Sequence, residues 1–169
     1  NIDDWCAWAV NNDIDESIVG FLRYRPQLLH SLDSTQYAFP SPRVWEMLNR
    51  KLPHITDMFY GCASLIGDGP AGEYIAFKNI YTDLPDIDQL LANPTTTKVP
   101  QETSQLYAIA GALTSRVTTD NFTTIMKYAR RMPPEYQVVI VRDSLAKSKE
   151  LVTTNEFKQW ATDNAEVLL

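Results

Sequence analysis

The side chains best suited to binding a ligand lie in the segment Phe39-Pro40-Ser41-Pro42-Arg43-Val44-Trp45-Glu46. Ser41 is a favourable N-cap, because its hydroxyl can accept a hydrogen bond from a free N–H in the first turn of a helix. Pro42 suits the next position, where the helix needs no N–H donor. Arg43 then lies in the first turn, where a cation opposes the helix dipole by about 0.3–1 kcal/mol at an exposed site. This placement raises the question of which anion Arg43 meets, and an ion pair with a local carboxylate such as Asp33 is one answer.

The remaining reactive side chains lack the spacing of a metal or catalytic site. The two histidines, His30 and His54, do not stand at zinc-ligand spacing from Cys6 or Cys62. We therefore expect solvated or capping histidines, buried free thiols and no bound metal. The sequence also has no Gly-x-Ser-x-Gly elbow and no local cysteine–histidine signature, which argues against a standalone enzyme.

The sequence also lacks the parts that grip a nucleotide in P-loop proteins. It has no G-x-x-x-x-G-K-[ST] loop and no apolar strand that ends in an acidic pair. Residues 67–72 match the letters of a dinucleotide-binding loop, Gly-x-Gly-x-x-Gly, but a helical segment precedes them instead of a strand. We expect a tight turn between two helices at this position.

The composition indicates a soluble globular protein, with 44% apolar and 21% charged residues among 169. The formal net charge of -6 argues against a sequence-independent grip on nucleic acid, which needs a basic surface. Lys127, Arg130 and Arg131 form a local basic cluster at the predicted end of a helix, where cations favour the dipole. Nucleic-acid binding is the alternative interpretation of that cluster.

The sequence gives three indications of where the chain resides. No run of 18 apolar residues could span a membrane, and no signal peptide is visible. Two cysteines do not make a disulfide framework in a chain of this length, and we expect a reducing cytoplasm.

The first residue is Asn1 and not Met, so we expect the chain to be a piece of a longer protein.

Apolar residues at helical spacing predict an all-α protein of about nine helices. Pro26, Pro53 and Pro133 mark expected interruptions or ends, because proline lacks the N–H that a continuing helix needs. Thr154 is a favourable N-cap for the last helix. The expected helices cover approximately residues 2–11, 15–24, 42–52, 55–65, 71–81, 103–113, 120–132, 135–150 and 154–169, with shorter turns at 27–29 and 86–91.

One stretch is ambiguous between helix and strand. Val138-Val139-Ile140-Val141 is a β-branched run that could form a buried strand. A lone strand has nothing here to pair with, and Tyr136, Ile140 and Leu145 also fit one face of a helix. We therefore predict a helix for this stretch.

The Pro-Ser-Pro-Arg segment at residues 40–43, followed by an aromatic residue and a helix, resembles the sensor-2 segment of AAA+ ATPases, in particular the MoxR-like group of bacteria and phages. Upstream, residues 21–26 and the pair Leu28-Leu29 are similar to the lid segment that precedes sensor 2. Downstream, residues 67–77 and 92–107 resemble the helical extension of some MoxR-like proteins. The lid resemblance covers roughly the first third of the chain.

The resemblance implies a function for the longer protein. Residues 1–53 would form a small AAA+ lid-like helical domain, and residues 54–169 a C-terminal α-helical extension. Arg43 would reach the γ-phosphate of ATP and link nucleotide state to lid angle. ATP and Mg would be held by a missing N-terminal α/β ATPase domain before Asn1, in a ring with neighbouring subunits that remodels or chaperones an unknown protein substrate. The chain alone would not hydrolyse ATP.

The alternative hypothesis is a non-enzymatic α-helical protein-interaction module. Such a module could use an exposed groove around Tyr107, Tyr128 and Trp160 to hold a partner protein. The other interpretation of these aromatic residues is ordinary core packing, which their helical spacing favours.

Overall fold

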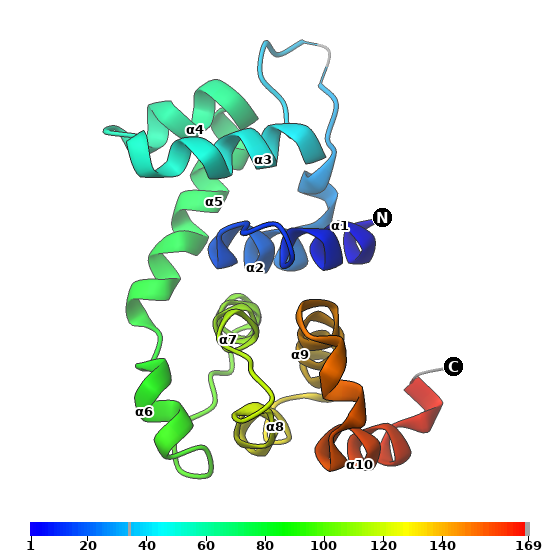
Figure 1. Ribbon diagram of the computed structural model, residues 1–169. Helices are drawn as coiled ribbons and strands as arrows, with labels where there is room; N and C mark the ends of the chain where they lie inside the picture. The colour runs from blue at the N-terminus through cyan, green and yellow to red at the C-terminus, as the bar shows by residue number, and fades with distance from the viewer. Residues whose placement is uncertain (34, 168–169) are drawn as a thin grey trace.

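The computed structural model describes residues 1–33 and 35–167, and these residues contain ten α-helices and no strand (Figure 1). The predicted all-α fold is confirmed. The helices are α1 (Ile2–Ala9), α2 (Glu16–Tyr24), α3 (Pro42–Lys51), α4 (Met58–Ile66), α5 (Asp68–Ile80), α6 (Ile87–Ala92), α7 (Thr103–Ser115), α8 (Phe122–Ala129), α9 (Pro134–Lys147) and α10 (Asn155–Asp163). Short 3-10 turns follow at Pro26–Leu29, Leu52–His54, Tyr81–Asp83, Lys149–Thr153 and Ala165–Val167. Residues 168–169 of the predicted last helix lie outside the described residues.

Local sequence sets the ends of several helices. Asp15 caps α2 by accepting a hydrogen bond from the Ser17 N–H at 2.8 Å. Thr154 caps α10 in the same way through the Phe157 N–H at 3.2 Å, which confirms the predicted cap. Each cap satisfies a first-turn donor that the helix itself leaves free.

The glycine-rich segment at residues 67–72 differs from the predicted turn. Only Gly67 lies between helices, with a φ of 85° and a ψ of 159°, and α5 already begins at Asp68. Pro70 fits inside α5 because it occupies the first turn, where its missing N–H leaves no hydrogen bond unmade. The prediction of a turn across the whole segment is therefore wrong. Helices α4 and α5 flank Gly67, so the segment also lacks the strand that a dinucleotide loop requires.

The ambiguous stretch 138–141 lies within α9, which confirms the predicted helix. Ile140 and Val141 are buried in the C-terminal half of the structure. Their packing partners include residues of α7 and α8. Tertiary burial of one helical face therefore outweighs the β propensity of the individual side chains.

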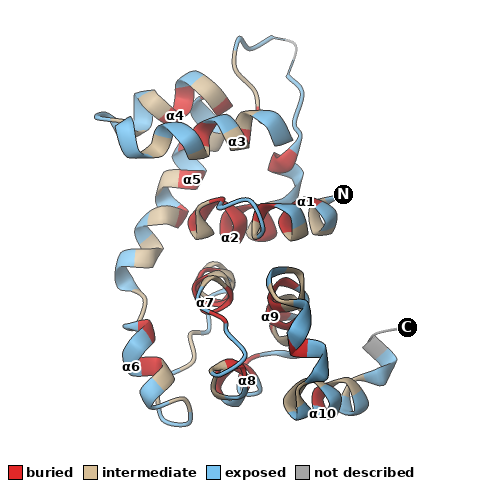
Figure 2. Cartoon of the chain, in the orientation of Figure 1, coloured by how far each residue is buried: buried red, intermediate tan, exposed pale blue. Residues whose placement is uncertain are grey.

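The buried apolar residues form two cores. The first core lies among α1 to α5 and centres on Phe21, whose ring lies 5.5–5.7 Å from the rings of Trp45, Tyr74 and Phe77. The second core lies among α6 to α10 and includes Tyr128 and Trp160. Helix α2 is buried along most of its length, because it packs within the first core on one side and against α7 on the other (Figure 2).

The first core continues beyond residue 53. It includes Cys62 and Ile66 of α4 and Phe77 of α5, so these two helices pack with α2 and α3. The predicted division into domains 1–53 and 54–169 stays a prediction. In packing terms, the change from one core to the other falls near the turn Tyr81–Asp83.

The two cores meet where α2 crosses α7. A Cβ atom added to Gly111 of α7 would lie 3.8 Å from the Gly20 Cα of α2, so the two backbones approach closely at this point. The Tyr81 hydroxyl lies beside both glycines and donates a hydrogen bond to the Glu16 carbonyl at 3.0 Å. Small residues at this crossing allow a separation that larger side chains would prevent.

Both cysteines are buried free thiols, which confirms that expectation. Burial raises the pKa of the Cys6 thiol to about 12, which keeps it protonated near neutral pH. Among the described residues, no helix has the length and apolar character needed to cross a membrane.

Candidate functional site

Arg43 occupies the first turn of α3, as the sequence predicts. The Ser41 hydroxyl accepts a hydrogen bond from the Val44 N–H at 3.3 Å, and Pro42 is the first helical residue. The predicted N-cap is therefore confirmed. The cap fixes the start of α3, and with it the backbone position from which the Arg43 side chain extends.

Two side chains anchor α3 on the rest of the first core through three hydrogen bonds. The buried Trp45 indole N–H donates to the Leu28 carbonyl at 2.8 Å. One turn further along, the Asn49 side chain accepts from the Asp15 N–H at 2.8 Å and donates to the Asp13 carbonyl at 3.2 Å. Anchors at both points hold the helix axis, so the direction in which Arg43 leaves the surface is set by the fold.

The Arg43 side chain is exposed, and it makes no hydrogen bond or ion pair with any described residue. Asp33 instead accepts hydrogen bonds from the Thr35 hydroxyl at 2.6 Å and the Thr35 N–H at 2.9 Å. These bonds hold the pKa of Asp33 below its ordinary value. The predicted ion pair between Arg43 and Asp33 is therefore wrong.

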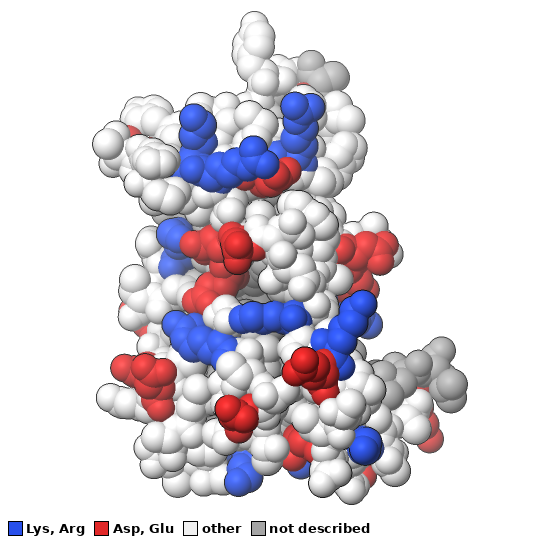
Figure 3. Space-filling view, viewed as in Figure 1, with Lys and Arg blue, Asp and Glu red and all other residues white. Residues whose placement is uncertain are grey.

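Arg43 belongs to a basic face of α3, which also carries Arg50 and Lys51 at its other end. Figure 3 shows basic side chains gathered over this helix. Arg50 pairs with Glu46 one turn earlier. Arg43 differs from Arg50 in two ways. No described side chain accepts a hydrogen bond from its guanidinium, and it lies at the N-terminal end of the helix, which favours anions.

A second polar cluster surrounds the buried Ser17 hydroxyl, which sequence reasoning missed. Ser17 contacts the Asp15 carboxylate, the Tyr74 hydroxyl at 2.9 Å and the Lys78 ammonium at 3.3 Å. Catalysis by a serine beside a lysine is strongly assisted by free N–H donors that stabilise an oxyanion. Here the N–H groups of residues 17, 18 and 19 all donate to Asp15. The cluster therefore caps α2 and holds it against α5. The Asp-x-Ser pattern at residues 15–17 is the sequence signal from which this cap could have been predicted.

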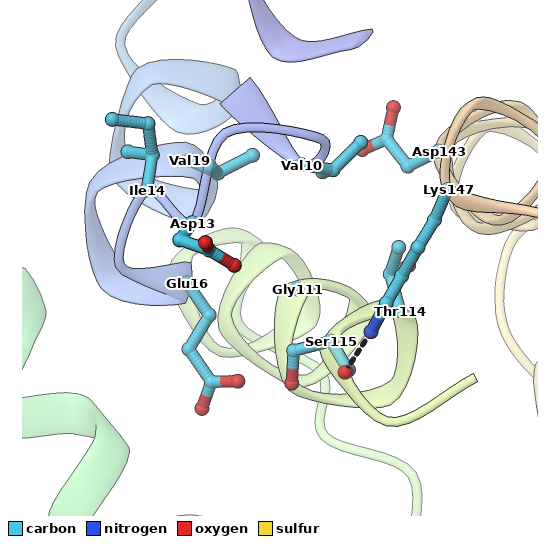
Figure 4. A pocket seen from close by; sticks show the side chains of 10 residues that line it. All are labelled: Val10, Asp13, Ile14, Glu16, Val19, Gly111, Thr114, Ser115, Asp143 and Lys147. Carbon is cyan, nitrogen blue, oxygen red and sulfur yellow. Dashed lines mark hydrogen bonds between the residues drawn. The ribbon is translucent and has the colours of Figure 1, made fainter. Parts of the chain in front are cut away.

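A cavity of about 160 Å³ lies at the junction of the two cores, between the α1–α2 connection, α2, α7 and α9 (Figure 4). Two of its charged groups have partners, since Lys147 donates to the Ser115 carbonyl and Glu16 pairs with Arg116 at 3.3 Å, whereas the buried Thr114 hydroxyl has no hydrogen-bond partner among the described residues. Desolvation lowers the pKa of Lys147. These contacts tie α2, α7 and α9 together around the cavity.

A buried ion pair joins α2 of the first core to α9 of the second, and sequence reasoning missed it as well. The Arg23 guanidinium contacts Asp143 at two points, with Nη2 on Oδ1 and Nε on Oδ2 at 3.2 Å. The exposed fractions of the two side chains are only 6% and 5%. Asp3 of α1 accepts from Arg23 at 2.5 Å and contacts Arg142 of α9 at 2.6 Å.

The other predicted candidates do not come together in one site. His30 and His54 are exposed and separate from the cysteines, and the described residues contain no group of three or more His, Cys, Asp or Glu that could hold a metal ion. Arg131 donates to the carbonyls of Pro94 and Thr97 at 2.8 and 2.7 Å. This arginine therefore fastens a loop to the end of α8.

The alternative hypothesis placed an exposed groove around three aromatic residues, and the burial of two of them contradicts it. Tyr128 and Trp160 are fully buried in the second core, and Tyr107 packs edge-on against Tyr136 with 4.9 Å between ring centroids. The Tyr128 hydroxyl donates to the Lys98 carbonyl at 3.0 Å. The core-packing interpretation of Tyr128 and Trp160 is confirmed.

Comparison of the chain with protein-family models, with curated proteins and with solved structures gives no match. Arg43 is an exposed cation in the first turn of a helix and has no ion-pair or hydrogen-bond partner among the described residues.

Proposed function

We propose that the chain is the C-terminal part of a MoxR-like AAA+ ATPase and supplies its nucleotide-sensing lid. Arg43 is the sensor residue and contacts the γ-phosphate of ATP. Phosphate binding at this position links nucleotide state to the angle of the lid. The longer protein is an ATP-driven remodelling or chaperone machine of the bacterial or phage cytoplasm, and the chain alone is inactive.

One observation carries this proposal: Arg43 is an exposed guanidinium at a helix N-terminus with no bonded partner among the described residues. A cation there is disfavoured by about 0.3–1 kcal/mol as long as no anion is present. A phosphate oxygen removes that penalty and forms a charge-assisted hydrogen bond, which is roughly twice as strong as a neutral one. Trp45 and Asn49 support the role, because they fix the helix that presents the guanidinium.

In this proposal, the present chain and the rest of the ATPase have different roles. An α/β motor domain holds ATP and Mg, with the phosphate loop and acidic residues that this sequence lacks. Arg43 adds positive charge on the opposite side of the phosphates, where it stabilises negative charge that builds up during phosphoryl transfer. The remaining partners are neighbouring subunits of a ring and a remodelled protein.

The decisive experiment replaces Arg43 with alanine in the full-length protein. Loss of one charge-assisted contact worth about 1.5–3 kcal/mol predicts a fall in ATP turnover of about 10- to 150-fold. Lys51→Ala is the matched control, because it removes an exposed cation from the other end of the same helix. Turnover that is unchanged in Arg43→Ala, or lowered equally by both substitutions, contradicts the proposal.

The alternative function, a non-enzymatic interaction module, depended on an exposed groove of aromatic residues. Two of its three aromatic residues, Tyr128 and Trp160, offer no exposed surface to a partner. The lid proposal retains its central residue at the surface, and we therefore prefer it.

A further inference from the structure

Three kinds of contact join the two cores, and each restricts a different movement between them. The first is the crossing of α2 and α7 at Gly20 and Gly111. A Cβ atom added at Gly111 would lie only 3.0 Å from the Tyr81 hydroxyl, so the crossing has little free space. A rotation or slide of the two helices would therefore bring backbone or side-chain atoms into collision. Helices α2 and α7 are thus closely fitted at one point.

The second contact is the buried pair between Arg23 and Asp143. Two parallel hydrogen bonds from one guanidinium fix both the distance and the direction between α2 and α9. Any other arrangement of the two cores leaves a buried charge without its partner, which is strongly unfavourable. A buried ion pair adds little net stability over apolar packing, so its effect here is on geometry.

The third contact joins α1 and the turn that follows it to α9. The Asn11 amide donates to the Ala146 carbonyl at 2.7 Å and to the Ala7 carbonyl at 2.8 Å. Asp3 bridges Arg23 and Arg142 nearby. The points of contact on α9 therefore extend over about one turn, from residue 142 to residue 146, and a hinge at this surface would break several of them together.

We propose that the two cores form one rigid body, in which the Arg23–Asp143 pair fixes the angle between helices α1 to α5 of the first core and helices α6 to α10 of the second. The mechanical consequence rests on the proposed function: a lid that turns with nucleotide state carries the C-terminal helices with it. Helices α8 to α10 then act as a lever arm that transmits the turn to a partner of the ATPase.

The test measures a distance across the junction in this chain, without nucleotide. Spin labels at Tyr60→Cys on α4 and Lys158→Cys on α10 report one position in each core, and both native residues are exposed. The native cysteines are buried and can stay in place. Pulsed dipolar spectroscopy is expected to give a single narrow distance distribution.

Asp143→Asn keeps the size of the side chain but removes the charge that faces Arg23. The distribution is expected to at least double in width, whereas the matched control Asp88→Asn, an exposed residue of α6, leaves it narrow. If Asp143→Asn does not fold, Arg23→Lys replaces it, since lysine keeps the charge and loses the two-point contact. The expected result is the same broadening.

Two outcomes overturn the rigid body: a broad distribution in the unsubstituted labelled chain, or an unchanged one in every folded junction variant. Neither outcome bears on Arg43, whose role is judged by ATP turnover in the full-length protein. A rigid junction together with normal turnover in Arg43→Ala would keep this inference and remove the proposed function.

Discussion

The junction between the cores makes a quantitative prediction for Asp143→Ala. The substitution removes the carboxylate that meets Arg23 at two points and leaves the guanidinium buried. Removal of one partner of a buried ion pair costs about 3–5 kcal/mol, mostly because the remaining charge is uncompensated. Arg23 keeps Asp3 at 2.5 Å, and the Asp3 side chain is 45% exposed, so part of the compensation survives. We therefore expect the lower end, about 3 kcal/mol.

Urea unfolding followed by circular dichroism measures this loss directly. For a chain of this length, about 3 kcal/mol corresponds to a fall in Tm of about 6–12 °C. The double variant Arg23→Met with Asp143→Leu replaces both charges by apolar groups and should lie within about 1 kcal/mol of the native protein. Asp163→Ala, an exposed carboxylate of α10, is the control and should change stability by about 0.5 kcal/mol or less. A loss below about 1 kcal/mol in Asp143→Ala refutes the reasoning, because the pair would then be solvated or absent.

Three further predictions concern single residues. Burial raises the pKa of the Cys6 thiol from 9.0 to about 12, so the folded thiol should resist alkylation at pH 8 and react only after unfolding. Because the folded pKa is the higher one, this contribution to stability is complete below about pH 9 and falls as pH rises towards about 12, which denaturant titrations at stepped pH would detect. Gly67→Ala should lower the free energy of unfolding by about 1–3 kcal/mol, since φ 85° and ψ 159° suit glycine alone. Gly69→Ala, in the open first turn of α5, is the control and should not lower it. Equal urea midpoints for the two variants would contradict this prediction. Ser41→Ala should lower the free energy of unfolding by about 1 kcal/mol through loss of the α3 cap, and Ser41→Thr should restore most of it.

The parts of the structure that sequence predicts correctly depend on neighbours within a few residues. The Ser41 and Thr154 caps follow from side chains that bond an N–H three positions on. The helical character of 138–141 followed from its spacing and from the lack of a partner strand. Local pattern was sufficient in these places because the deciding hydrogen bonds and apolar faces belong to the same helix.

The features that sequence reasoning missed depend on residues that only folding brings together. Arg23 and Asp143 are 120 positions apart, and nothing in either local pattern identifies the other. The surroundings of Arg43 were missed for a similar reason, because Asp33 is close in sequence but turns its carboxylate towards Thr35. At residues 67–72, glycine content suggested a turn, while Gly69 and Pro70 fit the first turn of α5 and Gly72 lies in the next turn of the same helix.

In the proposed function, Arg43 recognises the γ-phosphate, which ATP has and ADP lacks. The most direct measurement compares the affinity of the full-length protein for a non-hydrolysable ATP analogue and for ADP, in the native form and in Arg43→Ala. We predict that the substitution weakens binding of the ATP analogue by about 10-fold or more and leaves ADP binding unchanged. Equal affinities of native and substituted protein for the ATP analogue, or an equal loss for both nucleotides, would contradict the account.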